Sequence, residues 1–159
     1  MIIRPATPDD IPEILAFIRE LAEYEHESGS AIANPADLLR DGFTEPRRFH
    51  CLMAELDTLS AGFALYFYNY STWRGRPGIY VEDLFVRPAF RGRGIGKALL
   101  ARVAAVAVAE NCPRLDWAVL NWNTPAIDFY RSVAAVSLSE WTPMRLSGDA
   151  LTALAAHSE

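Results

Sequence analysis

Cysteine and histidine are scarce in this chain. Its 159 residues include two cysteines, Cys51 and Cys112, and three histidines. Two cysteines are too few for a disulfide framework or a zinc site, and His26, His50 and His157 lack the spacing of metal ligands. We therefore expect no metal site and interpret both cysteines as ordinary buried thiols.

The chain also lacks an apolar run long enough to cross a bilayer. Its first ten residues, MIIRPATPDD, show no basic patch leading into an apolar segment, which predicts a cytoplasmic protein without membrane association. Positive charge is in the minority, with 15 Lys and Arg against 20 Asp and Glu, and this argues against a nucleic-acid partner. An acidic chain with a local arginine cluster instead favours a small anion bound at one place and a cation attracted to another.

Apolar residues are plentiful, at 51% of the chain, and the length suits one domain, residues 1–159, with a sizeable core. Patterning predicts helices over 8–27, 35–42, 95–111 and 126–133, with Gly42 as the stop of the second. Strands are expected over 1–6, 49–56, 60–70, 78–86 and 115–120, the last buried on both faces, followed by short extended pieces at 136–138 and 141–146 and a small-residue tail. The order predicts a mixed α/β domain with a largely antiparallel sheet and one strand-helix-strand crossover.

The segment FVRPAFRGRGIGKALL, residues 85–100, joins a predicted strand to a predicted helix. Glycines at 92, 94 and 96 let a ligand approach the backbone, and the first amides of a helix have no internal partners. Such a loop suits a phosphate or pyrophosphate. Arg91, Arg93 and Lys97 add positive charge. The alternative is a flexible turn with solvated arginines.

Two common phosphate-binding motifs do not fit this segment. A Walker loop has Ser or Thr after its lysine, whereas Ala98 follows Lys97. A dinucleotide-binding fingerprint follows the first strand of a parallel series, which this position is not.

The segment Arg91-Gly92-Arg93-Gly94-Ile95-Gly96 matches the Arg/Gln-x-x-Gly-x-Gly/Ala signature of the GNAT superfamily of acetyl-CoA-dependent N-acetyltransferases. The segments ELAEYE, YVEDLFV and WNTPAIDFYRS resemble its diamine branch, the spermidine/spermine and thialysine acetyltransferases. The similarity covers nearly the whole chain with its motifs in order. It implies the GNAT fold, in which a splayed pair of strands holds acetyl-CoA, and a homodimer.

The resemblance also implies where acetyl-CoA binds. The pantetheine arm would follow the strand that ends at Val86, the pyrophosphate would lie on the glycine loop, and the start of the next helix would add a second contact. The implied cofactor-binding residues are Leu84, Phe85, Val86, Arg91, Gly92, Arg93, Gly94, Ile95, Gly96, Lys97, Asn123 and Ala126. Capping of the next helix is the alternative role for Asn123.

Acetyl transfer requires an amine that has lost its proton, and an alkylamine has a reference pKa of roughly 10.4. A carboxylate at the site can hold the ammonium and help to remove that proton. Glu82 and Asp83 are adjacent on a predicted strand, so strict alternation would place them on opposite faces. The resemblance gives the catalytic role to Glu82 and leaves Asp83 a structural one; the alternative is two solvated charges at a sheet edge.

Tyr130 matches the family tyrosine that protonates the departing sulfur. A phenol can donate a proton to a developing thiolate, although a core aromatic is the alternative role. A backbone amide near the end of the strand 84–86 would stabilise the oxyanion.

Acidic and aromatic residues match the amine site of the family and suit a polyamine or a lysine-like amine. The implied substrate-binding residues are Tyr24, Glu25, Trp73, Glu82 and Trp141, each with a surface or packing role as the alternative. Two positions depart from the family pattern. Ser71-Thr72-Trp73 stands where an Asp-Pro-Trp run is common, so one anionic contact is missing, and Ala134 replaces a usual glycine.

Together these patterns predict an N-acetyltransferase that moves acetyl from acetyl-CoA to a primary amine of a small cationic substrate. The amine attacks directly in a ternary complex, and neither cysteine is a nucleophile. The alternatives are acetylation of a peptide or protein amine, and a non-catalytic module that senses acetyl-CoA. The presence of both Glu82 and Tyr130 argues against the sensor.

Overall fold

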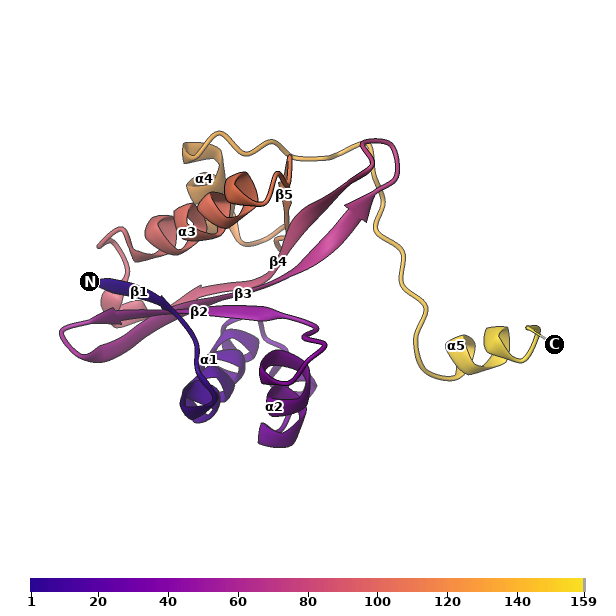
Figure 1. Ribbon diagram of the computed structural model, residues 1–159, viewed down its shortest axis with the longest axis horizontal. Helices are drawn as coiled ribbons and strands as arrows, with labels where there is room; N and C mark the ends of the chain where they lie inside the picture. The colour runs from indigo at the N-terminus through magenta and orange to yellow at the C-terminus, as the bar shows by residue number, and fades with distance from the viewer. Residues whose placement is uncertain (159) are drawn as a thin grey trace. The chain divides into compact units, whose positions relative to one another are not determined.

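The computed structural model describes residues 1–158 (Figure 1). The chain forms two compact units, Met1–Leu120 and Asn121–Glu159. Within residues 1–158, no helix has both the length and the apolar character needed to span a membrane. The interpretation of residues 1–159 as one domain stays a prediction.

The first unit is built on a five-stranded sheet in the order β1-β2-β3-β4-β5. Its strands are β1 (Ile2–Pro5), β2 (His50–Leu56), β3 (Leu59–Ser71), β4 (Arg76–Val86) and β5 (Leu115–Asp116). All neighbours are antiparallel except β4 and β5, which are parallel and joined through a helix. The predicted mixed sheet with one crossover is therefore confirmed.

The last strand of the sheet is shorter than predicted. β5 pairs with β4 only at Ile79↔Leu115 and Tyr80↔Asp116, and both β5 residues are half-buried. The expectation of a strand over 115–120 buried on both faces is wrong, because the pairing stops after two residues and residues 115–120 are half-buried or exposed.

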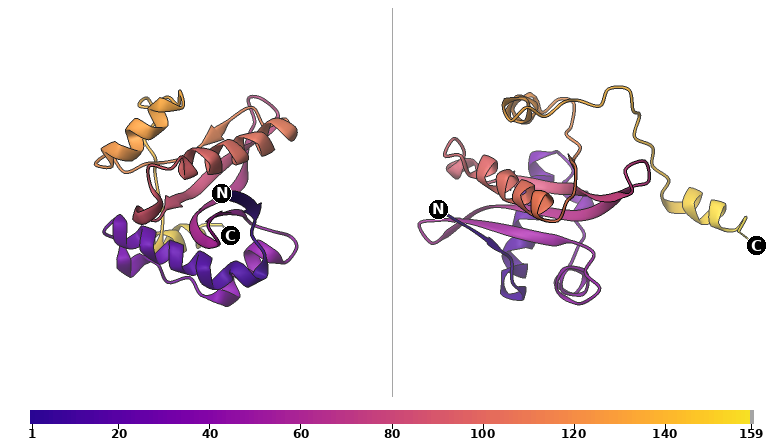
Figure 2. Two further views of the ribbon diagram at one scale, coloured as in Figure 1. Left: turned by 90° about the vertical axis from the view of Figure 1, so that its left-hand side faces the viewer. Right: turned by 45° about the horizontal axis from the view of Figure 1, so that its top comes forward.

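Helices cover both faces of this sheet. α1 (Ile11–Tyr24) and α2 (Pro35–Phe43) lie on one face and α3 (Ile95–Ala109) on the other, as Figure 2 shows. Asn34 caps α2, since its side chain accepts hydrogen bonds from the amides of Ala36 and Asp37. Gly42 lies inside α2 rather than after its end, where it was predicted.

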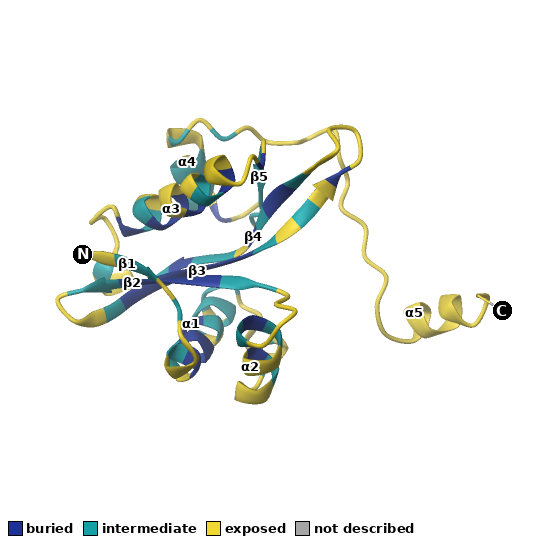
Figure 3. Ribbon diagram, in the orientation of Figure 1, coloured by how far each residue is buried: buried dark blue, intermediate teal, exposed yellow. Residues whose placement is uncertain are grey.

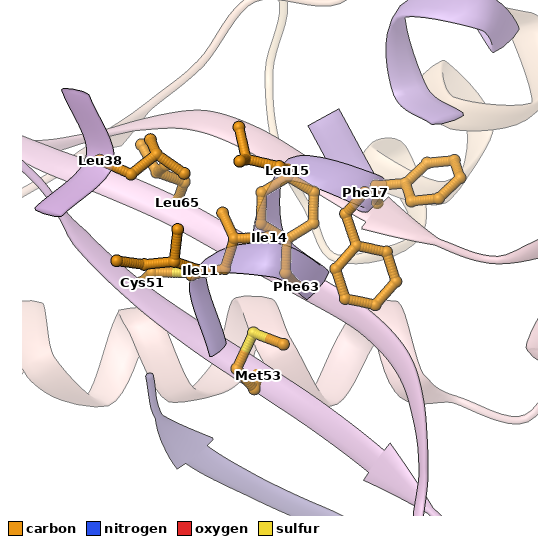
Figure 4. Packing of buried hydrophobic residues seen from close by; sticks show 10 residues of the cluster. Ile11, Ile14, Leu15, Phe17, Leu38, Cys51, Met53, Phe63 and Leu65 are labelled. Carbon is orange, nitrogen blue, oxygen red and sulfur yellow. The ribbon is translucent and has the colours of Figure 1, made fainter. Parts of the chain in front are cut away.

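The core between α1 and the sheet is aromatic and aliphatic (Figure 4). Phe17 of α1 stacks on Phe63 of β3 with 5.2 Å between ring centroids, and it meets Phe85 of β4 edge-on at 6.2 Å. Cys51 belongs to this core and Cys112 is also buried, which confirms that both thiols are buried. The core fixes the position of β4, the strand that carries Glu82 and Asp83.

Over residues 121–158, the described part of the second unit, the chain forms the helices α4 (Thr124–Ser132) and α5 (Gly148–Ala155). The stretches 136–138 and 141–146 carry no strand pairing and are largely exposed (Figure 3). The small-residue tail contains the helix α5.

Gly62 of β3 allows close pairing with the end of β4. It lies opposite Val86, and a Cβ atom here would fall inside van der Waals distance of the Phe85 carbonyl oxygen and 3.1 Å from the Val86 Cα. Because both neighbours are backbone atoms, we expect Gly62→Ala to lower the free energy of unfolding by about 1–3 kcal/mol. Urea unfolding measures this change in the free energy of unfolding. Gly29→Ala is the control, since a Cβ there meets no heavy atom within 4 Å; equal midpoints for the two variants would contradict the prediction.

Candidate active site

The glycine loop lies between the end of β4 and the start of α3. A short 3-10 helix, η3 (Pro88–Phe90), follows β4, and α3 begins at Ile95. Gly92 and Gly94 have φ angles of 75° and 78°, values that residues with a Cβ rarely adopt. Gly94 occupies the N-cap position of α3 and provides no side-chain cap. The first amides of α3 therefore have no helical acceptor, and Gly92 and Gly94 before them border open space, which suits an anion.

The cations of this segment differ in where they point. Arg91 donates from Nε to the Val86 carbonyl oxygen at 2.9 Å, and its guanidinium lies 4.8 Å from the centroid of the Tyr24 ring. Arg93 lies over the Phe90 ring at 6.0 Å, and Lys97 is exposed in the first turn of α3. Arg91 thus joins the end of β4 to the end of α1, which the sequence did not predict, while Lys97 extends the positive charge at the helix start.

The buried side chain of Ile95 packs into the protein, with 2% of its surface exposed. Any ligand contact by this residue would therefore come from its backbone. Gly96 lies in the first turn of α3 beside it.

β4 exposes part of one edge next to the loop. Its pairing with β5 ends at Tyr80, so the six residues from Val81 to Val86 have no β5 partner. Leu84 and Val86 pair with Ala64 and Gly62 and share one face of the sheet, whereas Phe85 is buried on the α1 face. β4 therefore continues past the end of its pairing with β5, and an extended ligand could follow this edge. The splayed pair of strands stays a prediction.

A β-bulge interrupts β4 at Glu82. Val81 pairs with Tyr66 and Asp83 pairs with Leu65, so two steps along β4 match one step along β3 and Glu82 is the extra residue. A bulge breaks the strict alternation of side chains, and bulges are common beside active sites.

The bulge breaks the alternation on which the expectation for the two carboxylates depends. Tyr80 pairs with Phe67 and Asp83 with Leu65, and these two β3 residues are two apart and so lie on one face. Glu82 is the unpaired residue between the two faces, so strict alternation no longer determines its direction. The expectation that Glu82 and Asp83 point to opposite faces therefore loses its basis, and it stays a prediction.

A third carboxylate approaches from α1. Glu25 is the C-cap residue of that helix, and burial, followed by repulsion from Glu27, raises its pKa. Burial, followed by repulsion from Glu82 and Glu25, raises the pKa of Asp83 to about 7. Asp83 is more buried than Glu82, which is exposed. We call Glu25, Glu82 and Asp83 the acidic face.

The other predicted substrate-binding residues are placed differently. Tyr24 precedes Glu25 at the end of α1 and lies under Arg91. Trp73 lies in the turn between β3 and β4 with 91% of its surface exposed. Arg76, where β4 begins, and Glu82 are six residues apart, a separation of roughly 20 Å along a strand. Trp73 precedes Arg76, so within one chain it does not reach the acidic face.

The remaining predicted residues belong to the second unit. Asn123 is buried and caps α4, accepting a hydrogen bond from the Ala126 amide at 3.3 Å. Asn123 therefore has the capping role, and its contact with acetyl-CoA stays a prediction. Tyr130 is half-buried on α4, with its ring centroid 5.2 Å from that of Phe129, and Trp141 is 69% exposed.

Sequence reasoning overlooked Arg87, which anchors the start of the loop. Its guanidinium forms ion pairs with Glu13 and Glu20 of α1 and lies 4.4 Å from the Phe17 ring centroid. It also donates to the Ser60 carbonyl oxygen at 2.9 Å. An arginine directly after an apolar strand is the only signal in the sequence, and its partners lie 67 and 74 positions away. Among residues 1–158, no cluster of three or more His, Cys, Asp or Glu side chains could hold a metal ion.

Known proteins resemble this chain over nearly its whole length. The chain is 42% identical to the thialysine N-epsilon-acetyltransferase of Bos taurus, covering 98% of this chain and 97% of the relative. It is 44% identical to the L-ornithine N5-acetyltransferase of Arabidopsis thaliana, covering 96% and 86%. The solved structure of an integron cassette protein from the mobile metagenome of V.cholerae matches with a TM-score of 0.81 and 29% identity, covering 97% and 96%.

The family profile "Acetyltransferase (GNAT) family" matches residues 14–134, from α1 to the end of α4. The match includes β4, the glycine loop and the acidic face. The chain belongs to the acetyltransferase (GNAT) family.

Proposed function

We propose that this chain is an N-acetyltransferase that moves the acetyl group of acetyl-CoA to a primary amine of a small cationic substrate, either a polyamine or a lysine-like amine. The amine attacks directly, in a ternary complex. The observation that carries the proposal is the pair of adjacent carboxylates on β4, Glu82 and Asp83, followed along the chain by the glycine loop at the start of α3. Relatives named for thialysine and L-ornithine acetylation support the substrate class.

The GNAT family uses acetyl-CoA as its cosubstrate, and the loop residues fit this molecule. A Cβ atom at Gly92 or Gly94 would meet nothing within 4 Å, so both glycines border open space. The first amides of α3, with Arg93 and Lys97 nearby, would hold the pyrophosphate. The strand residues Leu84, Phe85 and Val86 would hold the pantetheine arm by their backbone, and Asn123 and Ala126 would add contacts from α4. The bound thioester supplies the acetyl group.

The acidic face would handle the amine. A cationic amine would be attracted by the carboxylates of Glu82 and Glu25, and the ring of Tyr24, the residue before Glu25, would add an aromatic contact. Glu82 is exposed and would take the amine proton, directly or through water, so that the nitrogen lone pair can attack. Tyr130 would donate a proton to the departing thiolate. We also propose contacts of Trp73 and Trp141 with the amine, a homodimer and a cytoplasmic location.

A release assay for CoA tests the proposal. Thialysine, ornithine, spermidine, lysine and amino-terminal peptides are each offered with acetyl-CoA, and the free thiol is measured. We expect turnover with one or more of the small amines. Turnover with peptides alone would replace the proposed substrate class by a peptide or protein amine. Binding of acetyl-CoA without release by any amine would indicate a non-catalytic sensor.

The glycine loop gives a prediction for cosubstrate affinity. Gly94 has a φ of 78°, so Gly94→Ala strains the backbone by about 1–2 kcal/mol without a steric contact. We expect the affinity for acetyl-CoA to fall about tenfold, because the strained loop shifts the amides at the start of α3. Calorimetric titration with acetyl-CoA measures this affinity.

A matched control separates loop strain from general destabilisation. Gly75 has a φ of 61° with open space around it, in the turn between β3 and β4. Gly75→Ala carries the same type of strain and should leave acetyl-CoA affinity unchanged. Equal affinities for Gly94→Ala and wild type would remove the loop amides from the proposed site.

A further inference from the structure

The side chain of Arg87 uses all three of its nitrogens within the protein. Nε and Nη2 both donate to the Glu20 carboxylate, at 2.7 to 3.0 Å. Nη1 donates to the Glu13 carboxylate at 2.5 Å and to the Ser60 carbonyl oxygen at 2.9 Å. The guanidinium also lies 4.4 Å from the centroid of the Phe17 ring. Forked hydrogen bonds between a guanidinium and a carboxylate fix an orientation as well as contribute energy.

These contacts join one helix to the end of one strand. Glu13 and Glu20 are seven residues apart on α1, which places them two turns apart on one side of the helix. Arg87 directly follows β4, and its amide donates to the carbonyl oxygen of Ala61 on β3 at 3.0 Å. The main chain of Arg87 is thus held by the sheet while its side chain holds α1.

A hydrogen-bonded turn leads from Arg87 into the glycine loop. The Arg87 carbonyl oxygen accepts a hydrogen bond from the Phe90 amide at 2.9 Å, which closes η3. Arg91 then donates its amide to the Pro88 carbonyl oxygen and its Nε to the Val86 carbonyl oxygen. α3 begins four residues after Arg91. A shift of the chain at Arg87 would therefore move the amides at the start of α3.

The same side chain holds the part of α1 that leads to the predicted amine-binding residues. Glu20 lies about one turn before Tyr24. The Tyr24 ring lies 4.8 Å from the Arg91 guanidinium, and Glu25 follows at the C-cap of the helix. Because Tyr24 and Glu25 are proposed to bind the amine, Arg87 connects the amine side of the proposed site with its acetyl-CoA side.

We propose that Arg87 is a positioning residue that holds the glycine loop and the end of α1 in the arrangement that binds acetyl-CoA and the amine. It acts through the loop and the helix, since its own nitrogens are engaged within the protein. This inference rests on the proposed amine acetyltransferase.

Arg4 offers a matched control for the loss of ion pairs. Its three nitrogens donate to Asp10 and Glu55 at 2.6 to 2.8 Å, and its side chain is 34% exposed, against 25% for Arg87. Arg4 lies on β1, with β2 and β3 between it and β4. Arg4→Met therefore removes similar ion pairs without a connection to the glycine loop.

Calorimetric titration with CoA tests the inference without catalysis. We expect Arg87→Met to bind CoA about tenfold more weakly, because misplacement of a binding group by about 1 Å can cost up to about a hundredfold. Arg4→Met should bind CoA like the wild type, and urea unfolding measures the stability that each variant has lost. Wild-type affinity in Arg87→Met, or an equal loss of affinity in Arg4→Met, would overturn the inference.

A milder variant breaks the same bridge from the helix side. Glu20→Ala removes the forked partner of Arg87, and alanine is a strong helix former, so α1 keeps its structure. We expect CoA affinity to fall about threefold, with little further loss when Glu20→Ala is added to Arg87→Met, because the bridge is then already broken. Wild-type affinity in Glu20→Ala, or fully additive losses in the double variant, would contradict the proposed role.

Kinetics with an amine that is turned over give the second readout. At saturating acetyl-CoA, Arg87→Met should raise the KM for the amine about tenfold and change kcat less than about threefold, since Glu82 and Tyr130 remain in place. A fall in kcat with an unchanged KM would overturn the inference. A wild type that binds CoA and acetylates no amine would reject the proposed function, whereas wild-type CoA affinity in Arg87→Met would reject only the role of Arg87.

Discussion

Replacement of Tyr130 by phenylalanine is expected to lower the turnover number about a hundredfold or more while acetyl-CoA still binds. The proposed reaction expels a thiolate from the tetrahedral intermediate, and the phenol hydroxyl is the proposed proton donor to that sulfur. General acids contribute about 10²–10⁴-fold to such steps. The substitution removes one hydroxyl and keeps the ring, which packs beside Phe129 on α4, so it tests the acid rather than the packing.

The leaving group gives a sharper form of this test. A general acid matters less when the departing thiol is more acidic, because the thiolate then needs less help to leave. The rate loss in Tyr130→Phe should therefore shrink with an acetyl thioester of a more acidic thiol. Tyr70→Phe makes the same chemical change on β3, at a side chain that is 62% exposed, and should leave turnover unchanged. If Tyr130→Phe turns over like the wild type across the pH range, Tyr130 is not the acid.

The glycine loop could be predicted from sequence because its determinants are local. Glycines, a strand end and a helix start all lie within residues 85–100, and φ angles near +75° at Gly92 and Gly94 are what such glycines permit. The same holds for Asn34, whose neighbours along the chain make the cap. Most helix and strand positions could be predicted because the periodicity of apolar residues is also a local property of the sequence.

The acidic face could not be predicted in the same way, because it depends on pairing between strands. The bulge at Glu82 exists only through the register of β4 against β3, and no feature within YVEDLFV reveals it. One extra residue breaks the alternation between Glu82 and Asp83, and the fold brings Asp83 near Glu25, more than fifty positions earlier in the chain. The direction of Arg91 is likewise a tertiary property, fixed by the Val86 carbonyl and the Tyr24 ring.

Asp83 also affects stability, and the sign follows from its pKa. In the folded protein the pKa is about 7, against 3.8 for an ordinary aspartate. Between these two values the folded state holds a proton that the unfolded state has lost, so the free energy of unfolding falls as pH rises through this window. At 1.36 kcal/mol for each pH unit, the loss from this one group reaches about 4 kcal/mol by pH 8.

Asp83→Asn should remove that loss. The amide has nearly the shape of a protonated carboxyl and does not ionise, so we expect the variant and the wild type to have similar stability at pH 4. At pH 8 the variant should be more stable by up to about 4 kcal/mol. Urea unfolding at several pH values measures the difference, with Asp57→Asn, at an exposed position in the turn between β2 and β3, as the control that should follow the wild type.

The same experiment decides between two roles for Asp83. A carboxylate kept for structure would make the folded protein more stable when ionised, and Asp83→Asn would then be the less stable protein at pH 8. A carboxylate kept for the amine destabilises the empty site, and residues held for function often carry such a cost. Higher stability of Asp83→Asn at pH 8, together with weaker amine binding, would therefore support a functional carboxyl, and lower stability would return Asp83 to the structural role that the sequence predicted.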